Sequence, residues 1–94
     1  MTYELEFKVS ALKEWRKLDE SVRHQFKKKL LERLAQPRVE ANRLRHVPDC
    51  YKIKLRNAGY RLVYQVDDRK ILVIVVAVGR LDRLTVYRAA KDRT

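Results

Sequence analysis

The chain has 94 residues, and its 23 lysines and arginines outnumber its 12 aspartates and glutamates, which gives a formal net charge of +11. This length fits one domain over residues 1–94. The 46% of hydrophobic residues can form a small core, which excludes a disordered chain. So much uncompensated positive charge favours a polyanionic partner, with nucleic acid first and an anionic membrane or an acidic protein behind it.

The few cysteines, histidines and glycines exclude several classes of site. A single cysteine, Cys50, cannot form an internal disulfide, and with only His24 and His46 beside it we expect no metal site. We expect Cys50 to be a buried thiol and not a nucleophile. The chain has only two glycines, and no glycine-rich phosphate loop is present, so no cofactor is expected.

The longest apolar run, residues 71–78, is far shorter than the ~20 residues that a membrane-spanning helix needs. The first seven residues alternate charged with apolar side chains, unlike a signal peptide. We therefore expect a cytoplasmic protein without a membrane partner.

The first half of the chain predicts a strand followed by two helices. Tyr3, Leu5 and Phe7 alternate with charged residues, which indicates a strand over residues 2–8. Ser10 is the expected N-cap of a helix over 10–18, and a second helix is expected over 20–36. The apolar residues at helical spacing in these two segments are Ala11, Trp15 and Leu18, then Val22, Phe26, Leu30 and Leu34. Pro37 ends the second helix, and a connection follows to Pro48.

The second half has the period of strands. Residues 51–55 and 60–66 alternate in polarity around a turn at 57–59, which predicts a β-hairpin. Residues 71–78 are apolar at every position, as in a central strand covered on both faces. Residues 84–91 form either a short helix or an irregular edge. The expected fold class is α+β, in which a mostly antiparallel four-stranded sheet packs against the helical hairpin and leaves a sheet face or rim free.

Positive charge is most one-sided over residues 38–61, which hold seven basic and two acidic side chains. Lys52, Lys54 and Arg56 share one face of a strand, about 6.6–6.8 Å apart from one to the next. Crowded cations lower the basicity of a lysine. Such a row is either functional or a guard against edge-to-edge aggregation. The hairpin returns Arg61 close to Lys54 or Arg56.

Other candidate residues have a structural alternative. Lys27, Lys28 and Lys29 flank the apolar stripe of a helix and form a solvated or phosphate-steering face. Three tyrosines are expected to pack in the core or hairpin more than to stack on bases: Tyr51, Tyr60 and Tyr64. Tyr87 lies in a polar tail, where it either contacts a nucleotide or anchors the tail to the sheet.

Several motifs together resemble the RelE family of bacterial toxins. They are Cys50-Tyr-Lys-Ile-Lys-Leu-Arg, Gly59-Tyr-Arg-Leu-Val-Tyr-Gln-Val, Val78-Gly79, Val86-Tyr87 and Ala11-Leu-Lys-Glu-Trp-Arg-Lys-Leu. The similarity covers essentially the whole chain. The hairpin alone indicates the wider RelE/ParE superfamily, whereas the chain start, the 37–48 connection and the pair Lys52 and Lys54 resemble RelE itself.

The resemblance implies a ribosome-dependent endoribonuclease that cuts messenger RNA in the ribosomal A site through the RNA's own 2′-hydroxyl. It implies that Lys52 and Lys54 supply the base and charge stabilisation, that Arg61 binds the phosphate, and that Tyr87 orients or stacks on the nucleotide. Further contacts to RNA or the ribosome are expected from Arg56, Arg80, Arg83, Lys27, Lys28 and Arg45. No metal or other cofactor is implied.

One position departs from the family pattern. Where the family has an arginine soon after the Val-Gly pair, this chain has Leu81, which can neither donate a hydrogen bond nor hold charge. The family arginine is the candidate for acid catalysis or leaving-group stabilisation, so Leu81 is expected to weaken cleavage. Arg80 would point to the other side if this segment is extended. Arg83 could take the place of the family arginine only if the local backbone differs from the family's.

The implied partners are a RelB-type antitoxin, small-subunit ribosomal RNA with A-site messenger RNA, and operator DNA only through the antitoxin. Two alternative functions stay open. One is a ParE-like inhibitor of DNA gyrase that cuts nothing. The other is a non-catalytic ribosome- or RNA-binding protein, which Leu81 makes more plausible.

Overall fold

A four-stranded sheet organises the chain in this computed structural model, which describes residues 2–80 and 85–94. Its strands are β1 (Glu4–Phe7), β2 (Cys50–Leu55), β3 (Tyr60–Asp67) and β4 (Leu72–Arg80), in the spatial order β1-β4-β3-β2. β1 runs parallel to β4, and the other two pairings are antiparallel. The predicted α+β class with a mostly antiparallel sheet is confirmed.

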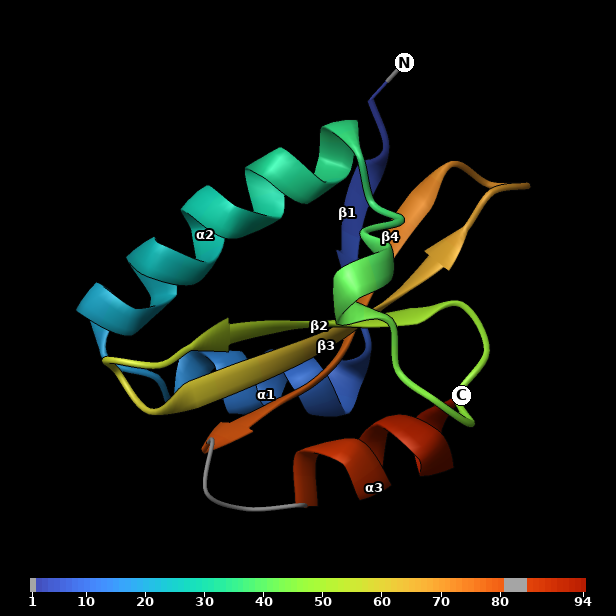
Figure 1. Cartoon of the computed structure of the whole chain (residues 1–94). Coiled ribbons are helices and arrows are strands. Elements are labelled where there is room, and N and C mark those ends of the chain that lie inside the picture. Colours follow the sequence, from blue (N-terminus) through green and yellow to red (C-terminus); the bar gives the residue numbers. More distant parts are fainter. Residues whose placement is uncertain (1, 81–84) are drawn as a thin grey trace.

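Helices cover both faces of this sheet (Figure 1). The helices α1 (Val9–Arg16) and α2 (Glu20–Ala35) pack on one face, and α3 (Thr85–Arg93) packs on the other against β3 and β4. A 3₁₀ turn, η1 (Glu40–Asn42), lies in the connection before β2. The sequence predicted a free sheet face or rim; a free face is wrong over β3 and β4, because α3 buries Val86 and Ala90 there, whereas a free rim stays a prediction.

The start of the chain differs in detail from the sequence-based prediction. Ser10 is not the N-cap; α1 begins one residue earlier, at Val9, and Lys8 precedes it without a side-chain cap. β1 is also shorter than the strand expected over 2–8, and its Leu5 is 37% exposed. Leu5 lies on the side of an edge strand that α2 only partly covers, so alternation alone overestimated its burial.

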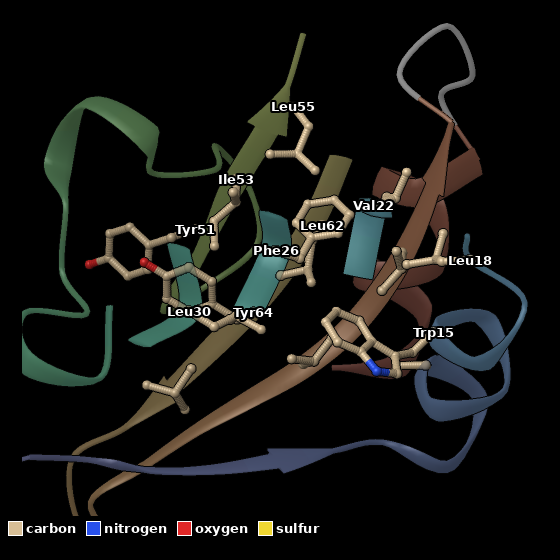
Figure 2. Close-up of a cluster of buried hydrophobic side chains, with 14 of the residues drawn as sticks. Trp15, Leu18, Val22, Phe26, Leu30, Tyr51, Ile53, Leu55, Leu62 and Tyr64 are labelled. Atoms are coloured by element: carbon tan, nitrogen blue, oxygen red, sulfur yellow. The ribbon is translucent and has the colours of Figure 1, made fainter. Parts of the chain in front are cut away.

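The main core lies between β2, β3, β4 and the helical pair. Buried side chains of α1 and α2 point toward strand residues that alternate along the hairpin (Figure 2). The residues labelled there are Trp15, Leu18, Val22, Phe26, Leu30, Tyr51, Ile53, Leu55, Leu62 and Tyr64. The structural interpretation is therefore confirmed for Tyr51 and Tyr64, which stack on each other and are fully buried, while Tyr60 is only half-buried.

A second, smaller core lies under α3. It joins residues of β3 and β4 with the connection before β2, and its buried members are Val47, Cys50, Val63, Val76, Ala77, Val86 and Ala90. This packing explains why residues 71–78 carry apolar side chains at both parities. Burial raises the pKa of the Cys50 thiol to about 11, which keeps it protonated and unreactive, as expected from the sequence.

One arginine holds the connection between α2 and β2 in place. The Arg38 guanidinium donates hydrogen bonds to Asp68, to Asp49 and to the Tyr51 hydroxyl. The Tyr3 hydroxyl also donates to Asp68. We call these four side chains around Arg38 the Arg38 clasp. The clasp joins the turn after β3 to the connection between α2 and β2.

Candidate active site

The lysines of β2 point away from the main core. Since Tyr51, Ile53 and Leu55 face α2, the alternating Lys52 and Lys54 must face the α3 side of the sheet, where both are half-buried. Lys54 stands directly opposite Arg61 of β3 in the antiparallel register. The sequence-predicted return of Arg61 to Lys54 is therefore confirmed.

Tyr87 of α3 joins this cluster through Arg61. The guanidinium carbon of Arg61 lies 4.5 Å from the centre of the Tyr87 ring, which is a cation–π contact. Arg61 Nε is buried and makes no hydrogen bond within the described residues. Tyr87 is itself packed against the smaller core, so it both anchors α3 and faces the cations.

Gly79 allows α3 to approach this closely. It pairs with Arg61 across the sheet, and a Cβ atom at position 79 would lie 2.5 Å from Cγ2 of Val86. Any larger residue would push Val86 away from the sheet, and Tyr87 with it. The Val78-Gly79 pair at the end of the strand is visible in the sequence, but only the structure shows that Gly79 makes room for Val86 of α3.

The cations of the cluster act on one another. The positive charge of Lys52 lowers the pKa of Lys54, and desolvation together with the charges of Arg61 and Arg56 lowers it further. A lowered pKa increases the fraction of neutral amine, which is the form that accepts a proton. The neighbouring cations therefore make neutral Lys54 easier to form than it would be for an isolated lysine.

The connection before β2 supplies the rest of the site. A hollow of about 290 Å³ is lined by Lys52 and Tyr87 on one side and by Arg43, Arg45 and their apolar neighbours on the other. A wider, more open hollow of about 580 Å³ continues along the connection past Glu40 and His46. Arg45 was among the predicted residues, whereas Arg43 was not singled out, since nothing in its spacing distinguishes it from other basic residues of the connection.

Three of the predicted basic residues lie elsewhere. Lys27 and Lys28 are exposed on α2, which covers the opposite face of the sheet. Arg80 pairs with Tyr60 across the strands and lies over its ring, 5.6 Å from the centroid, beside residues of α2. Leu81 and Arg83 fall outside the described residues. The structure therefore brings together Lys52, Lys54, Arg56, Arg61, Arg45 and Tyr87, which we call the cationic face.

Neither histidine joins the cationic face, and both are exposed. Within residues 2–80 and 85–94, no group of three or more histidine, cysteine, aspartate or glutamate side chains is placed to hold a metal ion. Among the helices that the structure describes, none has the length and apolarity needed to cross a bilayer.

Comparison with known proteins places the chain among bacterial toxins. Residues 5–84 match the family described as the ParE toxin of the type II toxin–antitoxin system parDE. The "mRNA interferase toxin RelE" of Escherichia coli strain K12 is 60% identical over 99% of this chain and 98% of its own length. The chain belongs to the RelE toxin family. The resemblance seen in the sequence is thereby confirmed.

Solved structures of RelE agree with this fold. An arginine-to-alanine double mutant of E. coli RelE in the free state matches with a TM-score of 0.92 at 59% identity, covering 99% of this chain and 98% of that one. RelE in the intact E. coli RelBE toxin–antitoxin complex matches with a TM-score of 0.82 at 63% identity, covering 86% of this chain and 99% of that one. The RelE architecture is therefore shared along almost the entire chain.

Proposed function

We propose that this RelE-family toxin is a ribosome-dependent endoribonuclease that cuts messenger RNA in the A site. The observation that carries the proposal is the cationic face, where Lys52, Lys54, Arg61 and Tyr87 meet on one side of the sheet. The name mRNA interferase, carried by a relative 60% identical over the full chain, supports the same activity.

The proposed reaction uses the RNA's own 2′-hydroxyl. Neutral Lys54 takes the proton of this hydroxyl as its oxygen attacks the adjacent phosphorus, and the bond to the 5′-oxygen breaks. The leaving 5′-oxygen takes a proton from water, which gives a cyclic phosphate and a free 5′-hydroxyl. Lys52 and Arg61 stabilise the negative charge that develops on the phosphate oxygens. Tyr87 orients the nucleotide by stacking. In the sequence, Leu81 takes the position of the family arginine to which the resemblance assigns the leaving oxygen, so cleavage should be slower than in the family.

The hollow between Arg45, Lys52 and Tyr87 extends this proposal to RNA binding. Its cations suit phosphates and its apolar walls suit a base or sugar, so it would hold the nucleotide next to the cut. Lys27 and Lys28, on the opposite face, would contact ribosomal RNA at most and not the reacting phosphate.

The decisive experiment is to incubate the purified protein with programmed ribosomes and map messenger cleavage at the A-site codon. Lys54→Ala should lower the single-turnover rate by two orders of magnitude or more, with little change in folding stability, because the substitution also relieves the charge repulsion from Lys52, Arg61 and Arg56. Lys28→Ala is the matched control, because it removes the same charge from the far face and should affect binding alone. Equal, modest losses in both variants would refute the assignment of Lys54.

A gyrase inhibitor is the second candidate, because the matched family description names ParE toxins. Such a protein would block DNA supercoiling by gyrase and would leave ribosome-bound messenger intact. The same preparation should therefore be tested for supercoiling inhibition, and we expect none. An RNA binder without catalytic activity would protect the A-site codon without cutting it.

We also propose a RelB-type antitoxin as the neutralising partner, by analogy with the E. coli RelBE complex. An inhibitor of a protein with net charge +11 should be acidic where it crosses the cationic face. The terminal helix α3 is the element most easily displaced or covered by it. Hydrogen exchange over residues 80–94 should change when the antitoxin is added, and an unchanged pattern would exclude α3 from the interface.

A further inference from the structure

The outer edge of β4 is closed by side chains and not by a strand. The pairing of β1 with β4 ends at Phe7 and Val75, so β4 continues beyond its parallel partner. A register shift at this point leaves Val76 without a partner on β3. Instead, Arg93 Nη1 donates to the Val76 carbonyl at 2.7 Å, and the Val78 amide donates to Glu14 Oε1 at 3.2 Å.

Glu14 and Arg93 are also bound to each other. Two hydrogen bonds of 2.9 and 3.2 Å join the Arg93 guanidinium to the Glu14 carboxylate in a bidentate pair. The Glu14 side chain is 34% exposed and the Arg93 side chain 24%, so solvent screens this ion pair less than one on the open surface. It connects α1 on one face of the sheet with the last turn of α3 on the other, across the β4 edge.

The helix α3 depends on such anchors. It has nine residues, too few for a stable helix without tertiary contacts. Val86, packed over Gly79, fixes its first turn, and Arg93, bound at the β4 edge, fixes its last turn. Tyr87 follows Val86 directly, so Val86 holds its backbone near the sheet but does not set the direction of the helix. A tilt of the helix axis about Val86 would therefore move the Tyr87 ring relative to Arg61.

We propose that Glu14 and Arg93 are positioning residues for the cationic face: their ion pair holds α3 in the orientation that keeps Tyr87 on Arg61. The proposal rests on the proposed function only for its effect on cleavage, since the positioning itself is a property of the free protein. Neither side chain touches the cluster of lysines, so the pair acts through Tyr87.

The first test compares Arg93→Ala with Lys91→Ala in ribosome-dependent cleavage. Both remove one positive charge from the end of α3, but Lys91 is exposed and lies outside the ion pair. Arg93→Ala should lower the cleavage rate at saturating ribosomes about ten- to a hundredfold, because small displacements of a positioning group cost this much. The half-saturating ribosome concentration should match that of Lys91→Ala. Equal saturating rates in the two variants would overturn the proposal.

A double-mutant cycle separates positioning from a general loss of stability. If the ion pair acts through Tyr87, Arg93→Ala should cost nothing further in a Tyr87→Ala background. Additive losses would mean that the pair acts by another route and would refute the proposal. If Arg93→Ala folds poorly, Glu14→Gln can replace it in this test. Glu14→Gln removes the charge, keeps the size of the side chain and can still accept the hydrogen bond from the Val78 amide, so it should lower cleavage in the same way.

A spectroscopic test does not depend on cleavage. The Tyr87 ring should shift the NMR signals of the Arg61 side chain, and this ring-current shift should disappear in Tyr87→Ala and shrink in Arg93→Ala, but persist in Lys91→Ala. An unchanged Arg61 signature in Arg93→Ala would refute the positioning role. If the unmodified protein cleaves nothing, the proposed function fails while this test of the ion pair still stands.

Discussion

At the scale of single residues, the chemistry of Lys54 depends on its neighbours. Lys52 on the same strand, Arg61 across the hairpin and Arg56 at the start of the turn all disfavour its protonated form. A lysine without such neighbours keeps the ordinary lysine pKa. In the proposed reaction, this crowding of cations increases the neutral fraction of Lys54, which is the form that accepts a proton.

This arrangement predicts how Lys54 titrates. In the free protein, the midpoint for Lys54 should lie below 10.5, the ordinary lysine value, and Lys52→Gln should raise it toward that value, because Lys52 is the largest cause of the shift. The charge repulsion destabilises the folded protein fully below the lowered pKa of Lys54 and is relieved as the pH rises through it. NMR titration of the lysine side chains measures both midpoints. A Lys54 midpoint unaffected by Lys52→Gln would contradict the coupling.

A second residue-scale prediction concerns Leu81, which lies outside the described residues. If this position faces the scissile phosphate, Leu81→Arg restores one transition-state donor, which is typically worth ~10²–10³ in rate. Single-turnover cleavage should rise by a factor in this range, and affinity for the ribosome should rise much less. Leu31→Arg, which adds the same charge on the exposed surface of α2, is the control. If Leu81→Arg changes nothing while Arg83→Ala abolishes cleavage, Arg83 already fills the role.

At the scale of elements, the Arg38 clasp positions the connection that brings Arg45 to the cationic face. The connection is also held by the hydrogen bond from the Tyr64 hydroxyl to the Pro37 carbonyl, by backbone hydrogen bonds such as that from the Leu44 amide to the Cys50 carbonyl, and by the burial of Val47. The clasp combines segments far apart in the chain, since Tyr3 and Asp68 are separated by 65 positions in the sequence. It therefore couples the shape of the site to the overall fold.

The clasp predicts a dependence of stability on acid. The hydrogen bond from Tyr3, and then those from Arg38, hold the pKa of the Asp68 carboxyl below its ordinary value of 3.8. The stabilisation is thus complete above about 3.8 and is lost as the pH falls through the lower folded value. Asp68→Asn should lower the melting temperature at neutral pH and flatten its decline below pH 4. Asp92→Asn, an exposed carboxylate of α3, should leave that decline as it is.

At the scale of the whole molecule, the sheet separates two tasks. The face under α1 and α2 holds most of the buried apolar area, while the other face combines a small core with the cationic cluster. Mutations of the core under α1 and α2 should lower the free energy of unfolding, whereas mutations around Lys52 and Arg61 should lower the proposed activity. Positive charge lies on both sides of the sheet, with Lys27 and Lys28 exposed on α2 and the cationic face on the α3 side, which agrees with the proposed RNA substrate.

Binding to ribosomes should therefore weaken steeply with salt. Each lysine or arginine that contacts a phosphate adds about 0.7 to the slope of log K against log salt concentration. Arg45→Ala should reduce the slope by about this amount, whereas Arg69→Ala, at the exposed turn after β3, should leave it unchanged. Binding assays over a series of salt concentrations measure the slope. An affinity independent of salt would contradict the electrostatic argument.

The sequence by itself determined the elements and the local contacts of this protein. Period-two alternation indicated that Lys52 and Lys54 share a face, and the short turn ending at Gly59, whose φ of 76° suits glycine, set Lys54 opposite Arg61. These features depend on neighbours a few residues apart, which periodicity and turn chemistry reveal. The resemblance to the RelE family added the proposed catalytic roles of Lys52, Lys54, Arg61 and Tyr87, which the periodicity of the sequence does not show.

Only the tertiary structure decided how the distant parts meet. That α3 covers the second sheet face, that Gly79 admits Val86, and that Tyr87 lies on Arg61 all follow from packing between the end of the chain and its middle. The Glu14–Arg93 pair likewise joins residues 79 positions apart. No periodicity encodes such contacts, because they depend on where a whole helix docks and on which polar backbone groups the short β1 leaves without a partner strand.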